Sequence, residues 1–146
     1  MMYLAQPYTH EDEAVQVHRF EIASYVCARL FIKGYTIFAP IVHWHEVAAK
    51  HKIPGNYDTW KKYNHAMLER STDLIVLAIS GWTNSRGLIG EVRHAHSLGT
   101  PAYIIRGWSR PELAMTTTRH LLEEISRGEN CEEPGLGHID IDGNDY

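Results

Sequence analysis

The chain has 146 residues, which is the size of one ordinary domain and is long enough to build a hydrophobic core without disulfides. A formal net charge of −4 gives no electrostatic reason to expect a nucleic acid polymer or a membrane as a partner. No stretch approaches the roughly 20 apolar residues that a membrane-spanning helix needs. The first residues also lack the basic and apolar segments of a signal peptide, so none is expected.

The two cysteines lie far apart in sequence and in different surroundings. Cys27 falls on the apolar side of a helical pattern, whereas Cys131 belongs to a polar segment. A structural disulfide between them is therefore not expected. Reduced thiols fit the cytoplasm, and this is the compartment that the sequence predicts.

Turn residues divide the first part of the chain into a strand and a helix. Residues 3–5 are predicted to form a short strand that ends before Pro7, because a residue that precedes proline avoids helical geometry. A helix is expected from there to about residue 33. Thr9 is its candidate cap, and Gly34 is its stop.

The next part repeats this alternation with a longer connection. A second strand is predicted at residues 35–39, where Pro40 ends it, and a loop over residues 41–56 is expected to follow. Asp58 is the candidate cap of a helix that begins at Thr59 and ends near residue 70.

The most apolar strand comes next. Residues 73–79 are rich in leucine, isoleucine and valine and end at a Ser-Gly turn, which is typical of a strand buried on both faces. A helix that contains Glu91 is predicted to end at Gly99, and a further strand is expected at residues 102–105.

A last helix is predicted from near Pro111 to about residue 127. Strands separated by helices imply right-handed βαβ connections and a mostly parallel sheet of four to five strands in a single doubly wound α/β domain. We assign residues 1–128 to this domain. Residues 129–146 form an acidic C-terminal tail, in which residues 138–141 have the pattern of an edge strand.

Three loops follow strand ends that should share one edge of such a sheet. They cover residues 6–10, 40–45 and 80–87, and each is rich in polar or turn-forming residues. Ligands of open α/β sheets bind at this edge, so we expect a site where the three loops meet. The candidate substrate-binding residues in the first two loops are Gln6, Pro7, His43 and His45.

Glu91 is the candidate reactive group of this site. It falls near the start of its helix and shares a turn with Leu88 and Val92, so its carboxylate would lie among apolar neighbours. Such a setting suits a nucleophile or an acid/base group. The alternative is that Glu91 only interacts favourably with the helix dipole or pairs with Arg93 or His94.

Three segments of the sequence resemble one known family. They are YLAQPY at residues 3–8, IFAPIVHWH at residues 37–45 and GWTNSRGLIGEVRHAHSLGTPAYII at residues 81–105. In these segments the chain resembles the nucleoside 2-deoxyribosyltransferase superfamily, which includes the deoxynucleoside 5′-monophosphate N-glycosidases. The most specific part is the pattern S-x-G-x-x-x-E-x-x-x-A-x-x-x-G-x-P, matched here by Ser85, Gly87, Glu91, Ala95, Gly99 and Pro101.

The resemblance implies a Rossmann-like, flavodoxin-like fold and a homo-oligomer without a metal or cofactor. It also implies an enzyme that cleaves the N-glycosidic bond of a nucleoside or nucleotide, as a hydrolase or a base-exchange transferase. Glu91 would be the nucleophile, Tyr8 would flank the sugar, and Ser85 would contact a 5′-phosphate. Asn64 stands near the position where the family carries an aspartate, and asparagine cannot act as a general acid. His65 or Asp58 is the candidate replacement.

The residue types suit this chemistry. The reaction passes through an oxocarbenium-like state, which a neighbouring carboxylate stabilises and then captures as a glycosyl ester. Backbone N–H groups of the Gly87 turn, at a positive helix end, can bind a phosphate or hydroxyl group, and Arg86 adds charge.

The ten histidines and four tryptophans raise two further questions. His43 and His45 would share one side of an extended segment, but His94 and His96 on a helix point about 200° apart. The sequence has no HExxH or paired CxxC motif, so we expect no metal and assign the first pair to a base pocket. Trp82, in the third loop, is the candidate for stacking on a base, with core packing as the alternative. For Trp60, on a predicted helix, core packing is favoured.

A second function fits the same loops. The protein could bind a nucleotide as a sensor or a sequestering protein, with Glu91 gripping only the sugar hydroxyls. The asparagine at position 64 favours this alternative, because it removes one candidate acid.

Overall fold

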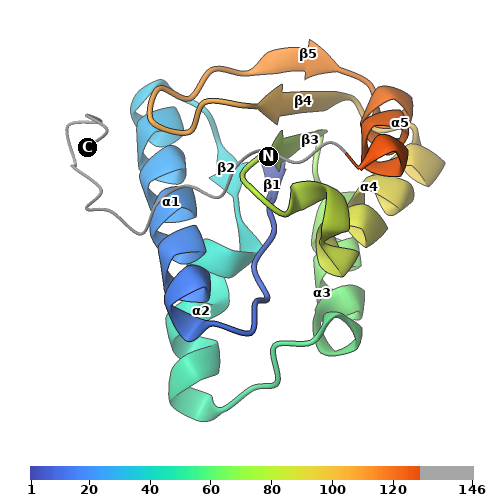
Figure 1. The fold of residues 1–146 in the computed structure, drawn as a ribbon. Helices are drawn as coiled ribbons and strands as arrows, with labels where there is room; N and C mark the ends of the chain where they lie inside the picture. The colour runs from blue at the N-terminus through green and yellow to red at the C-terminus, as the bar shows by residue number, and fades with distance from the viewer. Residues whose placement is uncertain (129–146) are drawn as a thin grey trace.

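Five strands form the central sheet of the protein, which a computed structural model describes over residues 1–128 (Figure 1). Four strands are parallel in the order β2-β1-β3-β4, and β5 pairs antiparallel with β4. This confirms the predicted single Rossmann-like domain with a mostly parallel sheet. The strands are β1 (Met2–Ala5), β2 (Ile37–Phe38), β3 (Asp73–Leu77), β4 (Ala102–Ile105) and β5 (Ala114–Thr116).

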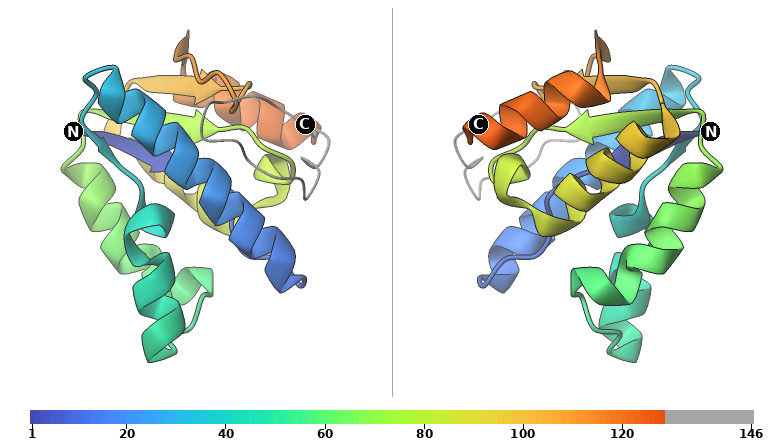
Figure 2. Two further views of the ribbon diagram at one scale, coloured as in Figure 1. Left: turned by 90° about the vertical axis from the view of Figure 1, so that its left-hand side faces the viewer. Right: turned by 90° about the vertical axis from the view of Figure 1, so that its right-hand side faces the viewer.

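Helices cover both faces of the sheet (Figures 1 and 2). Helix α1 lies on one face and α2 packs against it, whereas α3, α4 and α5 lie on the opposite side. The helices are α1 (Glu13–Ile32), α2 (Pro40–His51), α3 (Tyr57–Glu69), the 3₁₀-helix η1 (Trp82–Asn84), α4 (Arg86–Leu98) and α5 (Thr118–Arg127).

Strand β3 shows why the sheet is buried on both sides. Leu74 and Val76 belong to the core cluster that includes side chains of α3, α4 and α5. Ile75 and Leu77 point the other way, into the cluster built around α1. Successive side chains of a strand alternate between its two faces, so a continuous apolar run supplies both cores.

The helix ends follow the predicted chemistry with two changes. Gly99 adopts the left-handed conformation after α4, with φ of 69°, which glycine tolerates best. The cap of α1 is Asp12 rather than Thr9, and its side chain accepts a hydrogen bond from Ala14 N at 2.9 Å. The cap of α3 is Asn56 rather than Asp58. In both helices another polar residue, two or three positions away, takes the cap position.

Two elements differ from the prediction. The expected loop over residues 41–56 contains α2, because Pro40 occupies the first helical turn, where its missing N–H costs no hydrogen bond. The last helix begins at Thr118 rather than near Pro111, because residues 114–116 form the edge strand β5. Thr117 caps that helix by accepting a hydrogen bond from His120 N at 3.1 Å.

The predicted tail, its edge strand at residues 138–141 and Cys131 lie outside the described residues. Within residues 1–128, Cys27 is a free cysteine, and burial raises the pKa of its thiol to about 12. None of the helices in this range combines the length and the apolar character that a bilayer crossing requires.

Candidate active site

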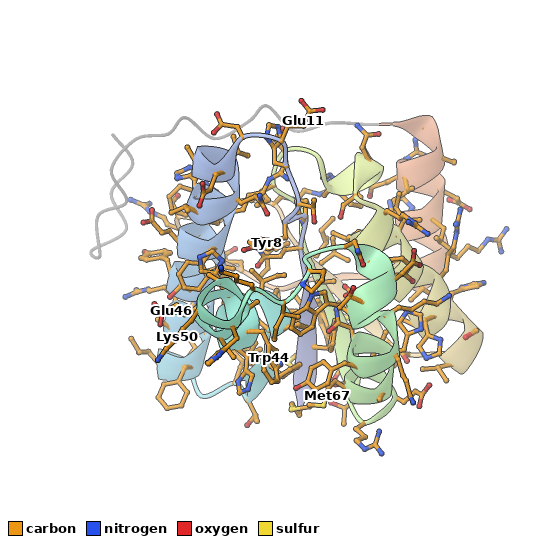
Figure 3. The ribbon with its side chains drawn as sticks, turned by 90° about the horizontal axis from the view of Figure 1, so that it is seen from below. Tyr8, Glu11, Trp44, Glu46, Lys50 and Met67 are labelled. Atoms are coloured by element: carbon orange, nitrogen blue, oxygen red, sulfur yellow. The ribbon has the colours of Figure 1, made fainter. Side chains whose placement is uncertain are left out.

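A cavity of about 530 Å³ opens at the carboxyl ends of the parallel strands. It is lined by the segment after β1, by α2, by the start of α3 and by residues 84–88 and Glu91 after β3. The chain leaves β1 toward β2 on one side and returns to β3 on the other, so the cavity lies at the switch point of the sheet. Figure 3 shows Tyr8 and Trp44 between the α1–α2 side and α3.

Glu91 lies in the second turn of α4, where it lines the cavity and is only 6% exposed. Its Oε1 accepts a hydrogen bond from the Tyr3 hydroxyl at 2.8 Å and another from Asn64 Nδ2 at 3.2 Å. Both bonds go to the same oxygen, which leaves Oε2 without a hydrogen bond from any residue in the described range. Oε2 is therefore the oxygen available to a ligand.

The donors around Glu91 carry no charge. Burial raises the pKa of the Glu91 carboxyl from its ordinary 4.5 to about 7, although the hydrogen bonds from Tyr3 and Asn64 lower it. A cationic neighbour would have kept this pKa low, and none contacts the carboxylate within residues 1–128. Glu91 is thus a carboxylate that changes its charge near neutral pH and has room for a ligand at one oxygen.

Tyr3 was not found by sequence reasoning. It lies in β1 with no exposed surface, and its position reads as an ordinary core residue of a strand. Its pKa is raised well above the usual value, first by burial and then by the charge of Glu91. Tyr3 therefore stays protonated and acts as a permanent donor to the carboxylate. No pattern in the sequence indicates this partner.

Tyr8 and His45 form a second polar pair in the cavity wall. The Tyr8 hydroxyl is hydrogen-bonded to His45 Nδ1, and the His45 ring stacks on Phe20 with centroids 4.1 Å apart. Burial and then Glu13 raise the pKa of the Tyr8 hydroxyl. These contacts join the loop after β1 to α2 and fix both side chains at the cavity.

The amino terminus of α4 opens onto the same cavity. Ser85 caps the helix, since its Oγ accepts a hydrogen bond from Leu88 N at 3.3 Å, and its hydroxyl still has a proton to donate. Gly87 lines the cavity at the first turn. Arg86 also lines it, but its side chain is 72% exposed and forms a 3.3 Å ion pair with Asp58. The Arg86 guanidinium is therefore exposed and paired with a carboxylate, whereas the Glu91 carboxylate is buried.

The loop after β1 is fastened by buried polar contacts. Gln6 Nε2 donates to the Arg19 carbonyl at 3.2 Å, while Gln6 Oε1 is buried without a hydrogen-bond partner among residues 1–128. Arg19 donates to the carbonyls of Thr9 and Ser80 at 3.1 and 3.2 Å, which ties this loop to the segment after β3. Gln6 lines the cavity, whereas the neighbouring Pro7 does not.

The aromatic residues of the cavity differ from those predicted. Trp82 is 1% exposed and packs in the core, so it cannot stack on a base. Trp60, which was expected in the core, lines the cavity with Trp44. His43 lies outside the cavity against Phe38, because α2 turns residues two positions apart to different sides of a helix.

Tyr57 also lines the cavity and was not predicted from the sequence. Its hydroxyl lies 3.2 Å from His65 Nε2, and His65 itself does not line the cavity. Asp58 likewise lies outside the lining. A tyrosine in the first turn of a helix gives no signal by itself. Its position becomes visible only when α3 and α4 are packed together.

The other histidines that could hold a metal have ordinary partners. His94 Nε2 lies 2.9 Å from Glu69 Oε1, and His96 Nδ1 lies 2.9 Å from Thr118 Oγ1. In the part of the chain that the structure describes, no group of three or more His, Cys, Asp or Glu side chains could hold a metal ion.

A family model now identifies the chain. The model for DUF1937, a domain of unknown function, matches residues 1–110. The chain belongs to the DUF1937 family. A search of curated proteins gave no match. The DUF1937 match spans β1 to β4 and contains every residue that lines the cavity, whereas β5 and α5 lie beyond it.

Proposed function

We propose that this DUF1937 protein cleaves the N-glycosidic bond of a deoxynucleoside or deoxynucleoside 5′-monophosphate, with Glu91 as a nucleophile that forms a covalent glycosyl intermediate. The observation that carries the proposal is a buried carboxylate with one oxygen unbound, facing an aromatic-lined cavity. The cavity volume of about 530 Å³ is within the range of small-molecule sites.

The neutral surroundings of Glu91 support this chemistry. An oxocarbenium-like transition state carries positive charge at the sugar, and an unbalanced carboxylate in a low-dielectric cavity attracts that charge strongly. Tyr3 and Asn64 hold Oε1, so Oε2 can approach the anomeric carbon from a fixed direction. A cation paired with Glu91 would have weakened both effects.

The rim of the cavity supports a nucleotide as the substrate class. The α4 amino terminus with Ser85 and Gly87 can bind a 5′-phosphate or 5′-hydroxyl, and Arg86 adds a positive charge nearby. Trp44, Trp60 and Tyr57 offer aromatic surfaces to a base. The resemblance of residues 81–105 to the nucleoside 2-deoxyribosyltransferase superfamily points to the same class.

One observation favours a non-catalytic nucleotide-binding protein as the second candidate. Burial raises the pKa of Glu91 to about 7, so part of the carboxyl is protonated and non-nucleophilic at neutral pH. Asn64 also cannot protonate a leaving base. In this alternative Glu91 only holds sugar hydroxyls.

Base release separates the two candidates. The full chain is incubated with a panel of nucleosides, deoxynucleosides and their 5′-monophosphates, and free base is measured by chromatography. The proposal expects release from at least one deoxy compound and its loss in Glu91→Gln. Binding without release, unchanged in that variant, would support the binding protein instead. Adding a second base to the reaction distinguishes a transferase, which forms a new nucleoside, from a hydrolase.

A further inference from the structure

The proposed reaction needs a group that gives a proton to the departing base. Asn64 cannot supply it, because an amide is not an acid and its Nδ2 is engaged by Glu91. Asp58 pairs with Arg86 and does not itself line the cavity. His65 also lies outside that lining. In the described part of the chain, two tyrosines whose hydroxyl group contacts a histidine are among the residues that line the cavity, Tyr8 and Tyr57.

The packing of Tyr57 places its hydroxyl against the turn of α4 that carries the nucleophile. The hydroxyl rests against the backbone of Gly90, the residue directly before Glu91, and a Cβ at position 90 would overlap it. Only glycine therefore allows Tyr57 to sit against this turn of α4. His65 Nε2 lies 3.2 Å from the hydroxyl, and the Arg86 guanidinium lies over the ring, 5.4 Å from its centroid.

The electrostatics also link Tyr57 to Glu91. Burial raises the pKa of the Tyr57 hydroxyl, the charge of Glu91 raises it further, and Arg86 lowers it. For Tyr8, by contrast, the pKa of the hydroxyl is raised by burial and by the charge of Glu13, and the charge of Glu91 is not among the causes. When Glu91 becomes a neutral ester, its effect on Tyr57 ends and the phenolate becomes easier to form.

We propose that Tyr57 is the acid/base residue of the site, with His65 as the residue that positions its hydroxyl; this inference rests on the proposed function. Burial, then His94 and Lys61, lowers the pKa of His65, so its ring is neutral. In the tautomer with hydrogen on Nε2, His65 donates to the Tyr57 oxygen and leaves the hydroxyl proton for the substrate. His65 itself supplies no proton.

The two half-reactions balance with this single proton. In the first, Glu91 Oε2 bonds to C1′ while the bond from C1′ to the base nitrogen breaks. The electron pair leaves with the base, which takes the Tyr57 proton. In the second, a water oxygen attacks C1′, its proton goes to the Tyr57 phenolate, and Glu91 is released as a carboxylate. The negative charge thus moves from Glu91 to Tyr57 and back, and the site keeps the same net charge throughout.

Leaving-group dependence tests this role, because a merely structural tyrosine would affect all substrates alike. The probes are the 5′-monophosphates of deoxyguanosine and N7-methyldeoxyguanosine or, where the panel shows release of pyrimidines, of deoxyuridine and 5-fluorodeoxyuridine. The second of each pair leaves more easily and needs less help from an acid. The variants are Tyr57→Phe, the matched Tyr8→Phe, and Tyr63→Phe as a control tyrosine on the same helix outside the lining.

We expect Tyr57→Phe to lose on the order of 100-fold in kcat/KM on the poor leaving group and less than about 10-fold on the good one. Tyr63→Phe should change neither. His65→Leu should also lose more kcat/KM on the poor leaving group than on the good one, but by a smaller factor than Tyr57→Phe. His65→Gln, which can still donate a hydrogen bond, should regain part of the kcat/KM that His65→Leu loses on the poor leaving group. Circular dichroism spectra verify that each variant is folded.

Three results overturn the inference in distinguishable ways. An equal loss on both leaving groups in Tyr57→Phe assigns it a structural role. A selective loss confined to Tyr8→Phe assigns the acid to Tyr8. If the wild type releases base from no compound of the panel, or Glu91→Gln releases it equally fast, the proposed function fails, and the assignment of Tyr57 fails with it.

Discussion

Two regions of the protein each bury a glutamate, and they solve the problem of its charge in opposite ways. Near the end of β4, Glu124 is 2% exposed, and its Oε1 lies 2.6 Å from Arg106 Nη2 and 3.0 Å from His120 Nε2. In the cavity, Glu91 is similarly buried but has only the neutral donors Tyr3 and Asn64.

The difference indicates what each carboxylate is for. A buried charge with a cationic partner is balanced within the fold, and the pair links α5 to the end of β4. A buried charge with neutral donors is left unbalanced, which costs stability unless something else compensates. Glu91 therefore has the properties of a group kept for a ligand, and Glu124 those of a group kept for the fold.

The largest expected effect separates the two residues by activity. Glu91→Gln keeps the shape and both hydrogen bonds to Oε1 but removes the nucleophile, so base release should fall by at least about 1,000-fold. In the wild type the rate should rise with pH through about 7, because the carboxyl must ionise before it attacks. A rate that does not change through this range would separate Glu91 from the chemistry.

Ionisation of Glu91, which the proposed activity requires, should lower the stability of the fold. Its folded-state pKa of about 7 lies above the ordinary 4.5, so the folded protein binds the proton more tightly and stability falls as pH rises between these values. Above pH 7 this cost is about 3 kcal/mol. Glu91→Gln should thus unfold at higher urea concentration than the wild type at pH 8, with no difference near pH 4.5. Equal midpoints at both pH values would contradict the account.

Glu124→Gln is the matched control. Removing this carboxylate takes the anionic partner of Arg106 and the nearer of the two carboxylates beside His120, so the free energy of unfolding should fall by about 2 kcal/mol. Base release by the folded variant should stay within about twofold of the wild type, since Glu124 does not line the cavity. A variant that lost release while remaining folded would show that the two regions are coupled.

Arg86→Ala should have the smallest effect on stability, under about 0.5 kcal/mol, because its ion pair with Asp58 is exposed. If the α4 amino terminus holds a phosphate, KM for a 5′-monophosphate should rise by about tenfold and KM for the nucleoside should not change. Steady-state kinetics on the two substrates measure this. Equal changes in KM would exclude a phosphate contact for Arg86.

Patterns of local origin predicted the fold well. The apolar run at residues 73–79 and the convergence of loops at strand ends depend only on alternation and on the geometry of parallel sheets. Glu91 was placed at the site by the same reasoning, whereas Tyr8 and Ser85 were assigned from the family resemblance, and all three line one cavity. Helix α2 was missed because proline stops a strand and starts a helix equally well.

The remaining site residues depend on packing between distant segments. Tyr3 contacts Glu91 across 88 positions of the chain, and no local pattern shows that a core tyrosine directs its hydroxyl to a carboxylate. Trp82 and Trp60 exchanged their expected roles because the path of η1 turns the first into the core. Tyr57 reaches the site only because Gly90 leaves room for it.

Trapping the glycosyl intermediate tests the role of Glu91 most directly. A deoxynucleotide with fluorine at the 2′ position of the sugar slows turnover of such an intermediate. Trypsin cleaves after Arg86 and Arg93, and the peptide of residues 87–93 contains Glu91 as its single acidic side chain. We expect this peptide to gain the mass of one fluorinated sugar 5-phosphate unit, and the corresponding peptide of Glu91→Gln to gain none. Base release with an unmodified peptide, or with the adduct on another residue, would contradict the assignment of Glu91 as the nucleophile.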